Sequence, residues 1–177
     1  GILALVHPDL LEDLAGLPLT EGERADYVLV GDMGDAWALA PLNTALRALV
    51  GGAQLTALQR NPRWWAKDGL RIDAGAFVAA LEYGAGTRCE TVFGKPARLF
   101  FEMALRDAGV QPDQAIMVGD DLEADILGAR QCGIRGALVR TGKFRPEQIT
   151  ADTPPIDLIL DDITHLPEAL TAGSAEP

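Results

Sequence analysis

Cysteine and histidine are scarce in this sequence, which has two of each among its 177 residues. The two cysteines, Cys89 and Cys132, lie far apart and in no metal-ligand spacing. Two cysteines are also too few to hold a domain of this size together by disulfides. The sequence therefore excludes a disulfide scaffold and predicts reduced thiols and a cytoplasmic location.

Basic residues are few as well, with 15 Lys and Arg against 26 Asp and Glu, which gives a net charge of -11. Such a field repels nucleic-acid phosphates and anionic lipids, so we expect no nucleic acid and no membrane as partner. Long apolar runs are absent too: the run at residues 1–6 is too short to span a bilayer. We interpret it as a strand, and because it opens the sequence with no polar lead-in, we expect that a longer chain was cut here.

Two nucleotide-binding motifs are also missing. The sequence has neither a Gly-x-Gly-x-x-Gly after a strand nor a Walker-type Gly-Lys-Ser/Thr. Their absence excludes the common dinucleotide and P-loop sites.

Apolar strand-like runs alternate with helical patterns along the whole chain, which is typical of an α/β protein with a largely parallel sheet. The hydrophobic content of 48% is enough for one full domain or two small ones. We expect strands over Ile2–Val6, Tyr27–Val30, Gln54–Leu58, Ala115–Val118, Gly136–Val139 and Leu158–Leu160.

Helical patterns fill the intervals between these strands. One helix, from Pro96 to just before Gly109, is expected to be the longest and to bury Leu99, Met103 and Leu105. The other helices are expected over residues 9–14, where Asp9 would be the cap, and over 43–50, 76–83 and 122–132.

An acidic cluster follows the strand that ends at Val118. Gly119 is followed by Asp120 and Asp121, and Asp125 comes four residues later in the first turn of the next helix. Ligands of open α/β sheets bind at the carboxyl ends of strands, and carboxylates held there suit Mg²⁺. The alternative is that Asp120 or Asp121 is simply a helix N-cap, since aspartate is a preferred cap residue.

A second feature, Gly94-Lys95-Pro96, directly precedes the longest predicted helix. A lysine at a helix start can contact a phosphoryl oxygen, with nearby backbone N–H groups assisting. The alternative is a solvated lysine beside a helix-starting proline. Lys95 followed in order by Asp120 and Asp125 forms a constellation typical of phosphoryl transfer, with one cation and one metal site.

These two motifs resemble the third and fourth sequence motifs of phosphatases of the haloacid dehalogenase (HAD) superfamily. The stretches Gly128–Ile134 and Leu138–Phe144 strengthen the resemblance. The pattern is similar to the subfamily with a large α/β cap of the C2 type, which includes phosphoglycolate and 4-nitrophenyl phosphatases. It covers roughly residues 2–150.

The resemblance implies a C2-type α/β cap joined to the C-terminal part of a doubly wound, Rossmann-like core with a parallel sheet. The cap would occupy residues 1–90, including the end of the linker from the preceding core. The core half would occupy 91–170 and a flexible tail 171–177. The elements change character near Thr91, which places the boundary at 88–93.

The resemblance also implies roles for individual residues. Asp120 would be the Mg²⁺ ligand, with Asp121 as an additional one, and Lys95 would bind the substrate phosphoryl group and neutralise its charge. Asp125 would hold the lysine or a metal-bound water. Asn61 lies in a cap loop that could face a small phosphorylated metabolite, together with Trp64 and Trp65, although a Trp pair is more often a packing feature. The basic residues of 140–145 are interpreted as a solvated loop.

The first motif of that family, an Asp-x-Asp that supplies the nucleophile and the general acid, occurs nowhere in this sequence. We therefore expect that the parent is a Mg²⁺-dependent phosphatase working through an aspartyl-phosphate, and that this chain alone is inactive. The alternative is a non-catalytic binding or interaction protein derived from such an enzyme. Because an incomplete sheet exposes strand edges and apolar surface, self-association or a homo-oligomer is also expected.

Overall fold

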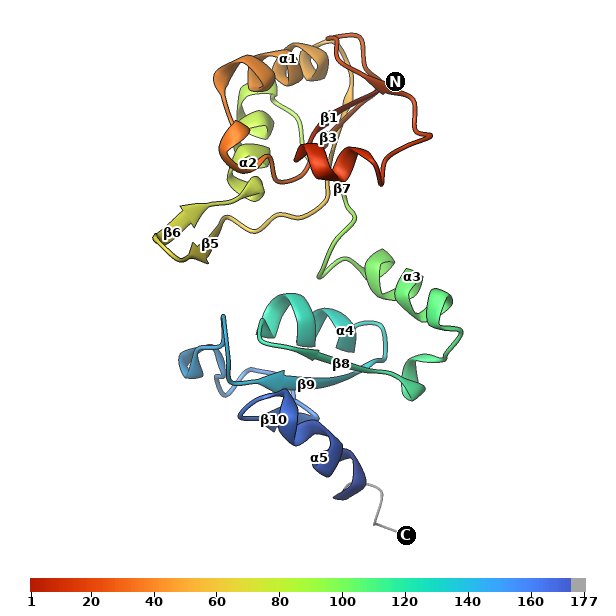
Figure 1. Ribbon diagram of the computed structural model, residues 1–177, viewed down its shortest axis with the longest axis vertical. Helices are drawn as coiled ribbons and strands as arrows, with labels where there is room; N and C mark the ends of the chain where they lie inside the picture. Colours follow the sequence, from red (N-terminus) through yellow and green to blue (C-terminus); the bar gives the residue numbers. More distant parts are fainter. Residues whose placement is uncertain (173–177) are drawn as a thin grey trace. The chain divides into compact units, whose positions relative to one another are not determined.

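The computed structural model describes residues 1–172, and the chain divides after Gly94 into two compact units. Figure 1 shows the first unit in red to green and the second in green to blue. Among residues 1–172, no helix is long and apolar enough to cross a membrane. Of the tail predicted at 171–177, Thr171 and Ala172 end the last helix, and the final five residues lie outside the described part.

The first unit, Gly1–Gly94, is built on a parallel sheet of five strands in the order β2-β1-β3-β4-β7. This sheet confirms the predicted α/β class. The two-residue strands β2 and β7 were not predicted, because so short a segment carries no periodic pattern. The strand bounds are β1 (Ile2–Leu5), β2 (Leu19–Thr20), β3 (Tyr27–Val30), β4 (Gln54–Ala57) and β7 (Thr91–Val92).

Two helices of twelve residues, α1 (Leu39–Val50) and α2 (Ala74–Ala85), pack on one face of this sheet. Both begin earlier than the predicted ranges 43–50 and 76–83. Pro41 is tolerated in the first turn of α1, because first-turn N–H groups have no helical partner. The shared core contains Leu3, Leu5, Val28, Val30, Leu55 and Ala57 of the strands with Ala45, Ala48, Leu49, Val78 and Leu81 of the helices.

Two further parts of this unit differ from the predictions. The helix expected at 9–14 is a short 3-10 helix, η1 (Pro8–Leu11), and its cap is His7 rather than Asp9: the Asp9 N–H donates to His7 Nδ1 at 3.3 Å. An antiparallel hairpin, β5 (Arg63–Ala66) with β6 (Gly69–Ile72), was not predicted. The first unit also contains the 3-10 turn η2 (Gly34–Ala36).

The second unit contains a parallel sheet of three strands in the order β10-β9-β8. These strands lie within one residue of the predicted bounds, at β8 (Ile116–Gly119), β9 (Arg135–Val139) and β10 (Leu158–Leu160). The helical segments and the strands of this unit share two small hydrophobic cores. One contains Phe101, Ala129 and Ile134, and the other contains Leu122, Ile126 and Leu138.

Helix α3 (Arg98–Ala108) starts two residues after Pro96, and with eleven residues it is not the longest helix. Its buried side chain is Phe101, whereas Leu99 and Met103 are both 44% exposed, so the prediction of the buried face was wrong for these two residues. Apolar residues lie around more of the α3 surface than the side that packs, and Phe101 and the partly buried Leu105 are the ones that contact the core of the second unit.

The helix predicted at 122–132 is not one continuous α-helix. Its first part, η4 (Leu122–Leu127), is a π-helix, and only α4 (Gly128–Arg130) is regular. π-helical turns inside helices occur frequently at functional sites. The remaining elements are η3 (Pro112–Gln114), η5 (Pro146–Gln148), η6 (Ile163–His165) and α5 (Leu166–Ala172).

Candidate functional site

The candidate site lies in the second unit, where β8 ends at Gly119 and η4 begins at Leu122. Asp120 and Asp121 occupy the turn between the two elements. β8 runs parallel to β9, so this turn is at the carboxyl edge of the sheet, where α/β proteins bind ligands.

Asp125 is the buried acid of this site, with a side chain only 6% exposed. Its Oδ1 accepts a hydrogen bond from Lys95 Nζ at 2.7 Å, and its Oδ2 accepts one from the Asp121 N–H at 3.2 Å. A side chain at position 119 would not fit, because a Cβ on Gly119 would lie 2.1 Å from Asp125 Oδ2. The glycine at the strand end thus makes room for this carboxylate.

Lys95 lies in the segment that leads into α3, three residues before that helix begins. Its side chain is 37% exposed, and its Nζ lies 6.0 Å from the centroid of the Phe100 ring. The ammonium group is therefore fixed by Asp125 on one side and open to solvent on another. It can contact an anion without losing its ion pair.

Asp120 is oriented by the loop after β9. Its Oδ2 accepts the backbone N–H of Lys143 at 2.7 Å. The preceding residue, Gly142, has φ of 49°, and a Cβ there would lie 1.8 Å from the same oxygen. The loop can approach Asp120 this closely only because residue 142 is glycine.

Asp121 differs from Asp120 because both of its carboxylate oxygens have protein partners. Oδ1 accepts the Ala124 N–H at 3.0 Å, so Asp121 is the N-cap of η4. Oδ2 lies 3.2 Å from Lys143 Nζ. The cap interpretation of the sequence therefore describes Asp121, and Asp120 is better placed to bind a cation.

The carboxylates at this strand end can supply part of a magnesium site. Mg²⁺ takes one or two protein carboxylates and completes its octahedron with water and substrate oxygens. Within residues 1–172 no group of three or more His, Cys, Asp or Glu side chains is arranged to hold a metal alone. Asp120 can thus supply one ligand, and a complete site needs further oxygens.

Lys143 is the residue that sequence reasoning missed. The basic residues at 140–145 were interpreted as a solvated loop, but all three have partners: Arg140 pairs with Asp161 at 3.0 Å and Arg145 donates to the Gly142 carbonyl at 3.0 Å. Lys143 contacts both Asp120 and Asp121. Gly142 directly before it was the available signal, because a glycine in a loop often marks a close approach.

Asn61 belongs to the first unit, in the segment between β4 and β5. Its carbonyl accepts the Gly75 N–H at 3.0 Å, which attaches the segment to the first turn of α2. Next to it, Gln59 Nε2 donates to Asp73 Oδ1 at 2.6 Å, and Asp73 also caps α2. The backbone at Asn61 is therefore held rigidly.

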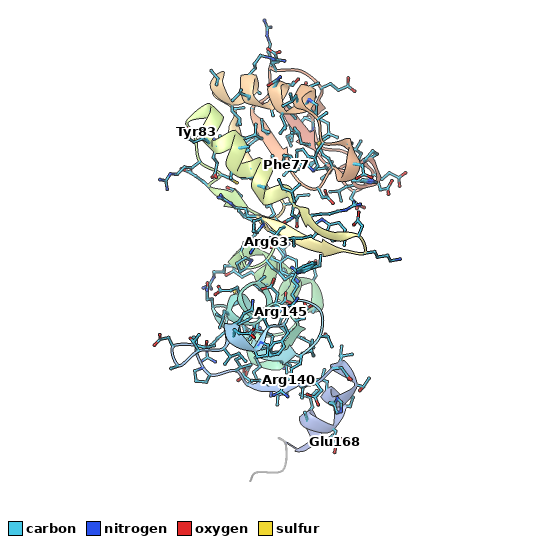
Figure 2. All side chains as sticks on the ribbon, turned by 90° about the vertical axis from the view of Figure 1, so that its left-hand side faces the viewer. Arg63, Phe77, Tyr83, Arg140, Arg145 and Glu168 are labelled. Carbon is cyan, nitrogen blue, oxygen red and sulfur yellow. The ribbon has the colours of Figure 1, made fainter. Side chains whose placement is uncertain are left out.

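The tryptophan pair expected beside Asn61 lies on strand β5 and not in a loop. Trp65 is 65% exposed, so the packing interpretation is wrong for this residue. Figure 2 marks Arg63 at the start of the same strand. On the other face of the hairpin, Trp64 borders a hollow of about 280 Å³ together with Trp37 and Phe77. The rings of Trp37 and Phe77 stack with their centroids 3.8 Å apart.

Comparison with known proteins places this site in a family. Residues 92–166 match the family described as HAD-hydrolase-like. The zebrafish (Danio rerio) phospholysine phosphohistidine inorganic pyrophosphate phosphatase is 36% identical over 168 residues, covering 94% of this chain and 61% of the relative. The human haloacid dehalogenase-like hydrolase domain-containing protein 2 is 39% identical over 163 residues, covering 90% of this chain and 62% of the relative.

Solved structures agree. A p-nitrophenyl phosphatase from Archaeoglobus fulgidus superposes with a TM-score of 0.85 at 25% identity, over 95% of this chain and 66% of the other. A 4-nitrophenylphosphatase from Thermotoga maritima gives 0.86 at 26% identity, over 96% and 65%. This chain belongs to the HAD superfamily of hydrolases. Its relatives fit the subfamily that carries a cap, as the resemblance of the motifs implied.

This HAD-like chain spans about three fifths of the length of the curated relatives that it matches. Lys95 and Asp125, which were predicted to act together, are in contact, and Asp120 directly follows the end of β8, five residues before Asp125. Asn61 lies in the other unit. The roles of these residues and the assignment of residues 1–90 as cap and 91–170 as core stay predictions.

Proposed function

We propose that this chain supplies the lysine and the magnesium-binding carboxylate of a HAD-type phosphatase that hydrolyses a small phosphate monoester. The observation that carries the proposal is the ion pair of Lys95 with the buried Asp125, whose carboxylate lies against Gly119, the last residue of the strand before Asp120. An ammonium group held against a carboxylate at a strand end is suited to a phosphoryl group.

The charge balance supports this function. Asp120, Asp121 and Asp125 carry three negative charges, and Lys95 and Lys143 carry two positive ones. The site therefore has one net negative charge, which favours a divalent cation. Once such a cation is bound the sign reverses, and the site then attracts a phosphate.

Each residue has a distinct part in this proposal. Asp120 would hold Mg²⁺ through the carboxylate oxygen that does not accept from Lys143, and the bound ion would stabilise negative charge on the phosphoryl oxygens. Lys95 would neutralise the phosphoryl group directly. Asp125 acts through Lys95 and is a positioning residue, because its own oxygens are occupied by Lys95 and the Asp121 amide.

The nucleophile and the general acid lie outside this sequence, since it contains no Asp-x-Asp. In the whole protein a carboxylate would attack phosphorus while a second carboxylic acid protonates the departing oxygen, and water would then hydrolyse the aspartyl-phosphate. The chain alone is accordingly inactive. For the substrate we propose a small phosphorylated metabolite, because the named relatives include phosphatases of nitrophenyl and pyrophosphate compounds. We also propose that Asn61 contacts this substrate.

A fusion experiment tests the catalytic part. The purified chain should not hydrolyse 4-nitrophenyl phosphate in the presence of Mg²⁺, whereas a fusion with the part of the zebrafish relative that this chain does not span should do so. Asp120→Asn should abolish turnover by the fusion, and Asp107→Asn, at a residue 76% exposed on α3, should not. Magnesium-dependent turnover by the chain alone that is lost in Asp120→Asn would contradict its proposed inactivity.

A binding experiment on the chain itself covers the case of a fusion that does not fold. In a titration with MgCl₂ followed by amide NMR, the signals of Asp120 and Lys143 should shift, because the Lys143 N–H donates to the carboxylate that would bind the ion. Asp120→Asn should remove these shifts and Asp107→Asn should retain them. Shifts confined to other acidic residues would refute the metal assignment.

A further inference from the structure

The parallel sheet of the first unit has two unlike faces. On one face, alternate residues of β1, β3 and β4 pack against α1 and α2 and are buried. The opposite face presents the intervening residues Ile2, Tyr27, Leu29 and Thr56. Parallel sheets normally have both faces covered, so the second face requires an explanation.

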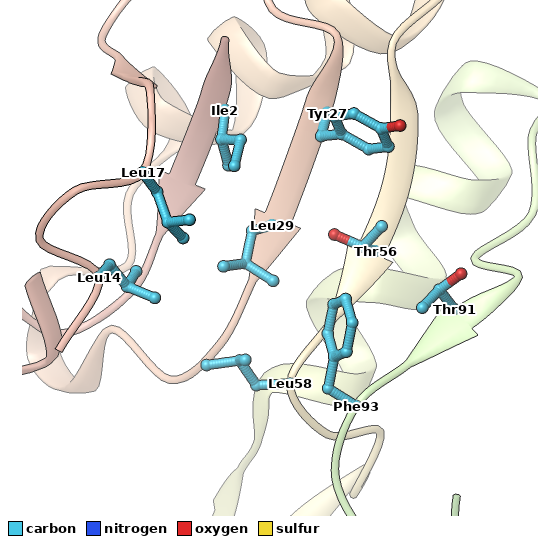
Figure 3. A pocket seen from close by; sticks show the side chains of 9 residues that line it. All are labelled: Ile2, Leu14, Leu17, Tyr27, Leu29, Thr56, Leu58, Thr91 and Phe93. Atoms are coloured by element: carbon cyan, nitrogen blue, oxygen red, sulfur yellow. The ribbon is translucent and has the colours of Figure 1, made fainter. Parts of the chain in front are cut away.

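The second face bears an apolar groove of about 420 Å³ (Figure 3). Its floor is formed by Leu29 and Thr56, and its walls by Leu17 on one side and Leu58 and Phe93 on the other. Three of the bordering side chains are substantially exposed: Leu17 by 47%, Tyr27 by 43% and Phe93 by 40%. Apolar side chains gathered in one hollow mark an interaction site, unlike apolar residues scattered singly.

The topology explains why this face has little cover. The connections from β3 to β4 and from β4 to β7 run in one direction across the sheet, and their helices α1 and α2 lie on the same face. The connection from β1 to β2 runs in the opposite direction, so a right-handed crossover places it on the other face. That connection contains only the four-residue η1 and contributes Leu14 and Leu17 to the groove.

The chemistry of the groove restricts what can fill it. The strands use their backbone groups within the sheet, and the Thr56 hydroxyl donates to the Val28 carbonyl at 3.1 Å. An occupant lying over this face must therefore satisfy its own backbone hydrogen bonds, which a helix does and an extended segment does not. Three strands spaced about 4.8 Å apart form a surface about as wide as a helix of roughly ten residues is long, because an α-helix rises about 1.5 Å per residue.

We propose that this groove is the docking site of an amphipathic helix carried by the part of the longer relatives that this chain does not span. That part is substantial, because the chain covers only 61% and 62% of the zebrafish and human relatives. The helix inserts its apolar side chains between Leu17 and Phe93 and covers the exposed ring of Tyr27. The inference is independent of the phosphatase proposal, since all the residues of the groove lie in the first unit.

A second copy of the chain fits the groove less well. Two copies that met face to face would place hollow against hollow and fill neither. Each copy also carries a net charge of -11, which opposes close approach. A convex apolar element such as a helix is complementary to the groove.

The test uses the full 177-residue chain and labelled synthetic peptides of about 15 residues that tile the unmatched parts of the zebrafish and human relatives. Binding is followed by fluorescence anisotropy, and helix content by circular dichroism. We expect one contiguous window, apolar at positions i, i+3, i+4 and i+7, to bind and become helical. Tyr27→Glu should weaken binding by about tenfold or more, since it places a charge in the groove.

The matched control is Tyr83→Glu, because Tyr83 lies on α2, on the other side of the sheet, and is 94% exposed (Figure 2). It should leave peptide binding unchanged. Two results would overturn the proposal: no window of either relative binds, or binding is equally weak in both variants. Light scattering that shows a dimer disrupted by Tyr27→Glu and not by Tyr83→Glu would assign the groove to a second copy and would likewise overturn it.

Discussion

Lys95 and Asp125 are thirty residues apart in sequence, and their side chains meet at 2.7 Å. The contact joins the segment before α3 to the first turns of η4. Because the carboxylate is almost fully buried while the ammonium group is partly exposed, the two partners contribute unequally to the fold. Removing the carboxylate also leaves the Asp121 N–H without its acceptor.

Asp125→Ala should therefore lower the free energy of unfolding by about 2 kcal/mol, the magnitude expected for breaking a partly buried, hydrogen-bonded ion pair. Urea unfolding measures this value. Asp107→Ala, at an exposed carboxylate, should stay within about 0.5 kcal/mol of the unchanged chain. Equal effects of the two substitutions would show that the pair adds no stability.

Gly142→Ala should displace the Asp120 carboxylate, since its Cβ would lie 1.8 Å from Oδ2. Gly109→Ala is the matched control, because Gly109 has a similar positive φ of 67° and no atom within 4 Å of a built Cβ. Both substitutions should cost about 1 kcal/mol of backbone strain in urea unfolding. Only Gly142→Ala should also abolish the NMR shifts that Mg²⁺ causes at Asp120, and retention of those shifts would contradict the contact.

Cys89 should react with iodoacetamide more slowly than Cys132 at pH 8. Burial raises the pKa of the Cys89 thiol above its ordinary value, so less of the reactive thiolate is present, and only 7% of the residue is exposed. Cys132 is less buried. Mass spectrometry of peptides from a time course measures both rates, and faster labelling of Cys89 would refute the packing around it.

Asp73→Ala should destabilise the first unit by about 1–2 kcal/mol, because Asp73 caps α2 and also accepts from Gln59 Nε2. Asp35→Ala provides the comparison, since the Asp35 side chain is fully exposed and its ion pair with Arg71 should contribute little to stability. Urea unfolding followed by tryptophan fluorescence reports on this unit, which contains all three tryptophans. A loss no larger than that of Asp35→Ala would show that the cap is dispensable.

The strands of the sheets could be predicted from the sequence because continuous apolar runs identify buried parallel strands. β3 and β10 have the predicted bounds, β1, β4 and β9 differ by one residue at one end, and β8 is shifted by one residue at both ends. The hairpin of β5 and β6 was missed because Trp65 and Ile72 are exposed and give no buried pattern. Asp68-Gly69 at its turn is a known hairpin signal that could have identified it.

The helices were harder to predict, and the reason differs from one to the next. In α3 the apolar residues Leu99, Phe101 and Met103 do not identify one face, and only contact with the small core selects Phe101. In η4 the π-helical turns place both the Asp125 N–H and the Ile126 N–H near the Asp121 carbonyl, at 2.9 Å and 3.4 Å. No sequence pattern predicts such a bifurcated turn.

The candidate residues that lie in short motifs could be named from the sequence, whereas a residue that tertiary structure brings to the candidate site could not. Lys95, Asp120 and Asp125 were recognised from local sequence, whereas Lys143 reaches Asp120 and Asp121 only because β8 and β9 are neighbours. That adjacency is a property of the sheet order. Local sequence contains no information about it beyond the glycine at 142.

The hydrogen bond to Asp120 comes from the backbone of residue 143, and this determines which residues positions 142 and 143 can accept. Since residue 143 donates through its backbone, any residue except proline can keep that contact, although only a cationic one keeps the contact with Asp121. Position 142 has no such freedom, because any side chain would collide with the carboxylate. In a saturation library, selection for a functional site should retain glycine at 142 and accept many residues at 143.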